Sequence, residues 1–115
     1  MQDLATRTQK FAYDIIVFYG NLPKDVVTQT IGKQFLRSGT SLGAHHREAS
    51  RARSKSEFTS KINLGLQELE ETRYWLELLL MAKIVTEKQL QPILQESTEL
   101  VAILAAISKK LKPWV

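Results

Sequence analysis

Hydrophobic residues recur at helical spacing in four separate segments of the chain. Apolar positions three or four residues apart share one face of an α-helix, and such stripes mark helices that pack against one another. Strict alternation, the mark of a half-buried strand, is absent over any useful length. The stripes are, in chain order, Leu4, Phe11, Ile15 and Phe18; Val27, Ile31, Phe35, Leu42 and Ala49; Phe58, Ile62, Leu66 and Leu69; and Leu90, Ile93, Leu100, Leu104, Ile107 and Leu111. The pattern predicts an all-α protein with four helices.

Three short joints separate these segments. Residues 20–23 (GNLP) combine a helix stop with a proline suited to the first turn of the next helix. At the second joint, residues 50–54, the run SKSE matches a capping box in which Ser54 is the N-cap and Glu57 reaches back to it. Residues 86–89 (TEKQ) repeat this arrangement at the third joint. We expect one domain over residues 1–115.

The third segment becomes apolar on nearly every side toward its end, where the apolar residues are Tyr74, Trp75, Leu76, Leu78, Leu79, Leu80 and Met81. A helix that is apolar all round is normally buried all round. A bundle of four helices covers only part of each helix, and large exposed apolar patches are rare on monomers. This segment therefore predicts a homo-oligomer, with an unusually central third helix as the alternative.

Gly39 and Gly43 lie four residues apart within the second helical segment, beside serine and alanine. Glycine inside a helix costs roughly 0.5–1 kcal/mol relative to alanine, so a compensating interaction is expected. We favour close packing of a neighbouring helix against these glycines over a ligand pocket.

Composition narrows the possible functions of the chain. With 115 residues, of which 43% are hydrophobic, the chain can bury one modest core. It contains no cysteine, which excludes disulfides, thiolate zinc sites and cysteine nucleophiles and fits a cytoplasmic protein. The N-terminus is polar, unlike a secretory signal. The most apolar run, residues 75–81, is far shorter than the roughly 20 residues that span a bilayer, so no membrane contact is expected.

Positive charge is concentrated in one part of the chain. The net charge is +4, and between Arg37 and Lys61 six basic residues face only two acidic ones, whereas the remainder of the chain is balanced. The six are Arg37, Arg47, Arg51, Arg53, Lys55 and Lys61. Arg47 and Arg51 lie one helical turn apart and could contact successive phosphates without reading sequence. This pattern favours non-specific binding of RNA or DNA at the corner between helices two and three, strengthened in an oligomer.

A different partner could also use this charge. The same basic residues could bind an acidic protein, or the acidic group Glu68, Glu70, Glu71 and Glu77 of an adjacent subunit. A run of like charge can also simply face solvent. The alternative function is therefore a protein-interaction scaffold.

The histidine pair His45-His46 gives little support to an enzyme or a metal site. Adjacent helical positions point about 100° apart, so these two side chains cannot reach one ion from the same helix. The chain has no HExxH motif, no glycine-rich phosphate loop and no GxSxG elbow. A metal-dependent enzyme using His45 would need ligands from another helix or subunit. We expect no catalytic residues, no metal and no cofactor.

The runs GKQFLRSGTSLGAHHREASRARSKSEFTSKI and ELEETRYWLELLLMAKIV closely resemble the bacterial four-helix bundle family of proteins encoded in intervening sequences of 23S ribosomal RNA genes. The resemblance covers almost the whole chain. It implies an up-and-down four-helix bundle that assembles as a homopentamer, with no established enzymatic activity. The accessory proteins of diversity-generating retroelements look like distant relatives, in which a basic pentameric barrel binds nucleic acid and a reverse transcriptase.

The resemblance also assigns roles to residues. It implies phosphate contacts by Arg37, Arg47, Arg51, Arg53 and Lys55, and a packing or subunit-interface set of Tyr74, Trp75, Leu78 and Leu79. Glu48 is expected to pair with a nearby arginine. The chain departs from the family at His45-His46, where Asn-Tyr or Asn-Ile is common. The departure puts any role of that asparagine amide in doubt and argues against an essential metal site.

Overall fold

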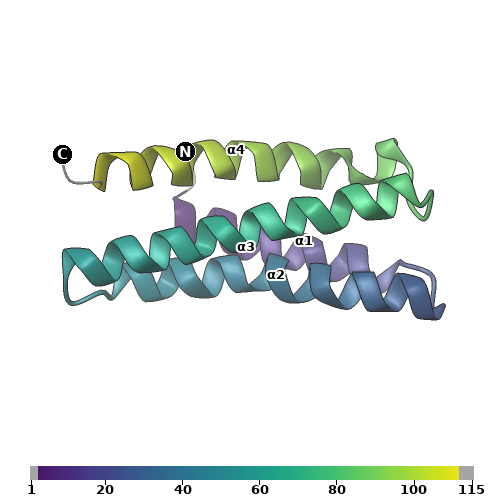
Figure 1. Cartoon of the computed structure of the whole chain (residues 1–115), viewed down its shortest axis with the longest axis horizontal. Helices are drawn as coiled ribbons and strands as arrows, with labels where there is room; N and C mark the ends of the chain where they lie inside the picture. The colour runs from purple at the N-terminus through teal and green to yellow at the C-terminus, as the bar shows by residue number, and fades with distance from the viewer. Residues whose placement is uncertain (1–2, 112–115) are drawn as a thin grey trace.

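A computed structural model describes residues 3–111 as a bundle of four helices (Figure 1). The helices are α1 (Leu4–Gly20), α2 (Val26–Ser50), α3 (Lys55–Met81) and α4 (Glu87–Leu111). Successive helices run side by side in opposite directions, and no strand occurs in this described range. The predicted all-α four-helix bundle is confirmed. The side chain of Leu111, the last position of the predicted α4 stripe, lies outside the described residues.

Side-chain caps fix where the helices begin. The Ser54 Oγ accepts a hydrogen bond from the Glu57 amide at 3.0 Å, as the capping-box pattern predicts. The Glu57 carboxylate makes no return bond to the Ser54 amide in the described structure, so only half of this box forms. At the third joint the box is complete, because the Thr86 Oγ1 accepts from the Gln89 amide at 3.2 Å and the Gln89 Oε1 accepts from the Thr86 amide at 2.8 Å.

The first joint differs from the prediction in one detail. Pro23 does not lie in the first turn of α2, because the helix begins at Val26 with Asp25 as its N-cap. The Asp25 Oδ1 accepts a hydrogen bond from the Thr28 amide at 3.0 Å. An aspartate two residues after the proline is a strong cap, and it sets the start of the helix.

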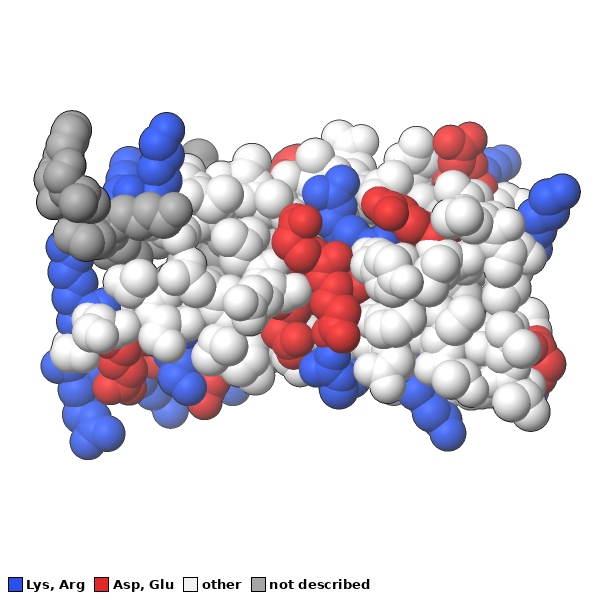
Figure 2. All heavy atoms as spheres, in the orientation of Figure 1, with Lys and Arg blue, Asp and Glu red and all other residues white. Residues whose placement is uncertain are grey.

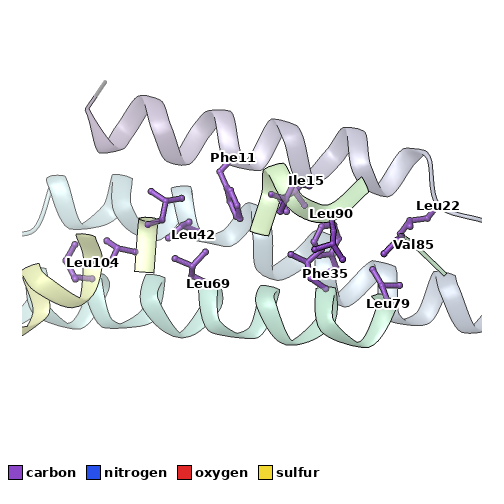
Figure 3. Close-up of a cluster of buried hydrophobic side chains, with 14 of the residues drawn as sticks. Phe11, Ile15, Leu22, Phe35, Leu42, Leu69, Leu79, Val85, Leu90 and Leu104 are labelled. Atoms are coloured by element: carbon purple, nitrogen blue, oxygen red, sulfur yellow. The ribbon is translucent and has the colours of Figure 1, made fainter. Parts of the chain in front are cut away.

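The core runs along the bundle axis and receives side chains from all four helices (Figure 3). Its largest fully buried hydrophobic members are Phe11, Ile15, Phe35, Leu42, Leu69, Leu76, Leu79, Leu90, Leu100 and Leu104. Val27 was predicted to belong to the α2 stripe, but it is 61% exposed. It lies in the first turn of α2, at the end of the bundle. The apolar spacing of α2 therefore starts at Val27, one turn before the part of the stripe that neighbouring helices cover.

Gly39 and Gly43 allow α1 to approach α2 closely. A Cβ atom added at Gly39 would lie 2.8 Å from the Ile15 Cγ1, and one added at Gly43 would lie 3.4 Å from the Thr8 carbonyl oxygen. The first distance is shorter than van der Waals contact allows. Close helix packing at these glycines, predicted from their spacing, is therefore confirmed.

The four helices do not contact one another equally. Most contacts join consecutive helices, and those between α2 and α3 are the most extensive, whereas α1 and α4 share few. Arg7 bridges α1 and α4: its Nη2 lies 2.6 Å from the Glu96 Oε1 and 3.2 Å from the Glu99 Oε1. No helix in residues 3–111 is long and apolar enough to cross a membrane.

The apolar end of α3 is only partly covered by the bundle. Leu76 and Leu79 are fully buried, whereas Tyr74 is 54% exposed and Met81 is 77% exposed. Trp75 and Leu78 are half-buried. Leu79 is therefore a core residue with no surface to offer a partner, contrary to the interface half of its predicted role. Tyr74, Trp75 and Leu78 keep exposed surface, and their place in a subunit interface stays a prediction.

Candidate nucleic-acid interface

The corner between α2 and α3 gathers four of the predicted phosphate-binding side chains. Arg47 lies in the last turn of α2, Arg51 is its C-cap, Arg53 follows in the joint and Lys55 is the first residue of α3. A cation in the last turn of a helix is favoured by the helix dipole, and this explains Arg47 without any ligand. Lys55 has the opposite placement, at a helix N-terminus, where the dipole disfavours a positive charge. The dipoles of the two helices therefore do not account for the whole basic set.

The four corner cations are all exposed and lack ion pairs within the chain. Across residues 3–111, no carboxylate oxygen lies within 4.0 Å of the charged groups of Arg47, Arg51, Arg53 or Lys55. Their charges are thus available to an anion from outside the described bundle.

The other two predicted residues have partners within the chain. Arg37 lies on α2 far from the corner, and it forms an ion pair with Glu68 at 3.1 Å and a second with Glu71. These two carboxylates hold the guanidinium across the α2–α3 interface and raise the pKa of Arg37. Lys61 lies 3.6 Å from Glu48. Arg37, predicted as a phosphate contact, is therefore a structural link between two helices.

Glu48 serves a structural role, but not with the expected partner. Its carboxylate lies 3.6 Å from the Lys61 Nζ on α3 and 3.1 Å from the His45 Nδ1. Neither partner is an arginine. His45 thus faces α3, while its neighbour His46 lines a groove between α1 and α2. The two histidines point to different sides, as their adjacency on a helix predicts. No cluster of three metal-ligating side chains occurs in the part of the chain that the structure describes.

Burial perturbs the titration of His46. Burial disfavours its charged form and lowers its pKa below the ordinary 6.5, and the Asp3 carboxylate opposes this only weakly. The pKa of Asp3 is itself lowered by hydrogen bonds from Thr6, so Asp3 stays ionised in this pH range. The unfolded chain therefore binds a proton at position 46 more readily than the folded chain does.

This difference predicts a pH-dependent stability. The contribution of His46 is fully present above about pH 6.5 and is lost as the pH falls from there through the lowered folded-state pKa. We expect the thermal midpoint of the wild type to decrease between about pH 7.5 and pH 5, and His46→Tyr to remove part of that decrease. Val26→Ala is the control, because it removes no titratable group from an exposed position, and it should leave the decrease unchanged. An unchanged pH profile in His46→Tyr would contradict the assignment.

The fold adds two cations that the linear charge pattern missed. The C-terminal end of α4 lies beside the N-terminal half of α3, where the Ser108 Oγ donates a hydrogen bond to the Asn63 Oδ1 at 2.6 Å. Lys109 and Lys110, in the last turn of α4, therefore belong to the same end of the bundle as the corner. Basic side chains crowd this end, at the left of Figure 2. The doublet was visible in the sequence, but only the antiparallel order of the helices places it there.

Acidic side chains gather near the middle of the face shown in Figure 2, and others lie toward both ends. The acidic group of α3 comprises Glu68, Glu70, Glu71 and Glu77. Glu68 and Glu71 are engaged by Arg37, and Glu70 lies 3.9 Å from Arg73. Most of this group is therefore compensated within its own chain. It has little unpaired charge with which to attract the basic end of another subunit.

Comparison with known proteins places the chain among its relatives. The family described as 23S rRNA-intervening sequence protein matches residues 2–106. A crystal structure of a protein of unknown function, from the S23 ribosomal protein family of Bacteroides thetaiotaomicron VPI-5482, has 40% sequence identity and a TM-score of 0.85. The alignment covers 93% of this chain and 99% of that one. No curated protein matches the chain. Sequence and fold agree, and the chain belongs to the 23S rRNA-intervening sequence protein family.

Proposed function

We propose that this protein is a non-enzymatic, cytoplasmic nucleic-acid-binding bundle that contacts the phosphate backbone of RNA or DNA through its basic end. The observation that carries the proposal is the set of four exposed cations at the α2–α3 corner, Arg47, Arg51, Arg53 and Lys55, which have no carboxylate partner among residues 3–111. Lys109 and Lys110 extend the same surface.

The chemistry of these side chains fits the phosphate backbone of a nucleic acid. Arginine and lysine neutralise phosphates and release their counterions, which supplies affinity that does not depend on sequence. Within residues 3–111, the basic end carries no row of exposed aromatic side chains on which bases could stack. We therefore propose binding that is non-specific and strongly weakened by salt.

Assembly would multiply the charge of this surface. A homopentamer, as the family resemblance implies, would present five copies of the basic end, and linked copies bind far more tightly than a single one. The exposed surface of Tyr74 and Met81 on α3 supports an apolar contact between copies. The scaffold alternative has less support, because Arg37 already compensates Glu68 and Glu71.

The test compares two double variants that change the net charge equally. Arg53→Ala with Lys55→Ala removes one joint residue and one first-turn residue at the basic end. Lys24→Ala with Lys88→Ala removes one joint residue and one first-turn residue at the opposite end. Binding of labelled mixed-sequence RNA and DNA is measured by fluorescence anisotropy across a salt titration. Each lost phosphate contact should make the slope of log K against log salt less negative by about 0.9. The basic-end variant should therefore have a slope less negative by about 1.8 and bind at least about tenfold more weakly at low salt.

Three outcomes would refute the proposal. The wild type showing no binding at low salt would do so directly. Equal losses in the two double variants would show that total charge, rather than the basic end, governs binding. An unchanged salt slope in Arg53→Ala with Lys55→Ala would remove the corner from the interface.

A further inference from the structure

A groove between α1 and α2 leads into the basic end of the bundle. Its walls carry small side chains, among them Ala5 and Ala12 on α1 and Ala44 on α2. Gly43 lines it as well, at the point where α1 comes close enough for an added Cβ to touch the Thr8 carbonyl oxygen. Small side chains therefore form one part of the groove, and the longer side chains of Gln9, His46, Arg47, Glu48 and Arg51 complete its lining.

Two of the cations without ion pairs, Arg47 and Arg51, line this groove. Ala44, Arg47 and Arg51 follow one another at spacings of three and four residues, so they form one stripe along α2. Arg47 and Arg51 are one turn apart, or about 6 Å along the helix axis. An extended backbone lying in the groove would pass one guanidinium after the other.

The other titratable groups near the groove do not cancel this charge. Glu48 borders the groove, but its carboxylate is engaged by His45 and Lys61 on the side facing α3. Asp3, at the start of α1, accepts a hydrogen bond from the Thr6 amide. His46 lines the groove, and its neutral imidazole has both a donor and an acceptor nitrogen for a polar ligand. The lining thus carries two arginines without ion pairs, one glutamate whose charge is offset by Lys61, and one hydrogen-bonding imidazole.

The width of the groove restricts what can enter it. Axes of packed helices lie roughly 8–10 Å apart, so a groove between two of them is narrow compared with a double helix. A double helix could touch only the rims, since its two strands wind around a much thicker body. Charged grooves that follow a single backbone are the common device for binding single-stranded nucleic acid.

From these observations we infer that the α1–α2 groove is a subsite for one single strand of RNA or DNA, whose successive phosphates contact Arg47 and Arg51. The inference rests on the proposed nucleic-acid binding and adds that the groove accepts single strands and not duplexes. A single strand enters the groove beside Arg47 and Arg51 and also contacts Arg53 and Lys55, whereas a duplex contacts the corner and the lysines of α4 without entering the groove.

The decisive variant fills the groove without changing its charge. Ala44→Phe places a bulky ring between the walls, and Ala5→Phe does so from the α1 side; both alanines are exposed, so the fold should tolerate the change. Ala102→Phe adds the same ring to an exposed position of α4, away from the groove, and is the control. The probes are labelled oligo(dT) and a mixed-sequence duplex of equal length, and thermal unfolding checks that each variant is folded.

We expect either groove variant to weaken oligo(dT) binding about tenfold, comparable with the loss of two phosphate contacts, and to leave duplex binding unchanged. Ala102→Phe should bind both probes as the wild type does. If both groove variants bind oligo(dT) normally while Arg53→Ala with Lys55→Ala weakens both probes, the groove inference fails and the proposed function stands. If the wild type binds neither probe, both fail. If the groove variants change the oligomeric state measured by light scattering and not the binding, the groove is an interface between copies.

Discussion

The Phe35→Ala variant is expected to have a free energy of unfolding about 3–5 kcal/mol below that of the wild type. Phe35 has no exposed surface, and its ring lies 5.5 Å from that of Phe18, centroid to centroid. Truncation removes the transfer free energy of the ring and leaves a cavity between helices that cannot fully close. Because small domains are stable by only about 5–15 kcal/mol, the loss is a large share of the total.

Urea denaturation followed by circular dichroism measures this loss. Val26→Ala is the control, because Val26 is 81% exposed at the start of α2 and its truncation should change stability by less than about 0.5 kcal/mol. A decrease below about 1 kcal/mol for Phe35→Ala would mean that the core does not depend on this ring as the packing indicates.

The second large effect is expected at Gly39. In Gly39→Ala, the new methyl group would lie 2.8–3.0 Å from the Cγ1, Cγ2 and Cδ1 atoms of Ile15. Ile15 is fully buried, so its branched side chain has no space into which to move. Overpacking of this kind costs about 1–3 kcal/mol, which exceeds the 0.5–1 kcal/mol that alanine gains over glycine inside a helix.

A double-mutant cycle identifies the cause of that loss. Ile15→Ala destabilises the protein by itself, but it removes the three atoms that the new methyl group meets. On this background Gly39→Ala should stabilise the bundle by about 0.5–1 kcal/mol, and the sign of its effect should therefore reverse. Gly20→Ala is the control, since nothing lies within 4 Å of an added Cβ there. Destabilisation by Gly39→Ala in both backgrounds would contradict a specific clash with Ile15.

The sequence was sufficient to predict the features of this fold that depend on local spacing. The four helices, the three joints, the Ser54 cap and the close packing at Gly39 each follow from residues within one or two turns of one another. Features that depend on how helices align were not predicted. The Arg37 ion pairs with Glu68 and Glu71 join residues more than 30 positions apart, and they require the register of α2 against α3.

The candidate site shows the same division. Its centre, the α2–α3 corner, is continuous in sequence, and charge counting located it. Its extension by Lys109 and Lys110 depends on the antiparallel return of α4, and its groove depends on the distance between α1 and α2. Leu79 has the packing role of the two roles implied for it, because residues 78 and 79 differ by about 100° in direction, so one is half-buried and the other is in the core.

The sparse contact between α1 and α4 has a consequence for how the chain folds. Nearly all tertiary contacts join helices that follow one another, so each one closes a short stretch of chain. The pairing of the first helix with the last, which would require ordering almost the whole polypeptide, contributes little. Such a low contact order is typical of helical domains that fold within about microseconds to milliseconds. A newly made chain could therefore add one hairpin at a time and hide its apolar faces soon after they emerge.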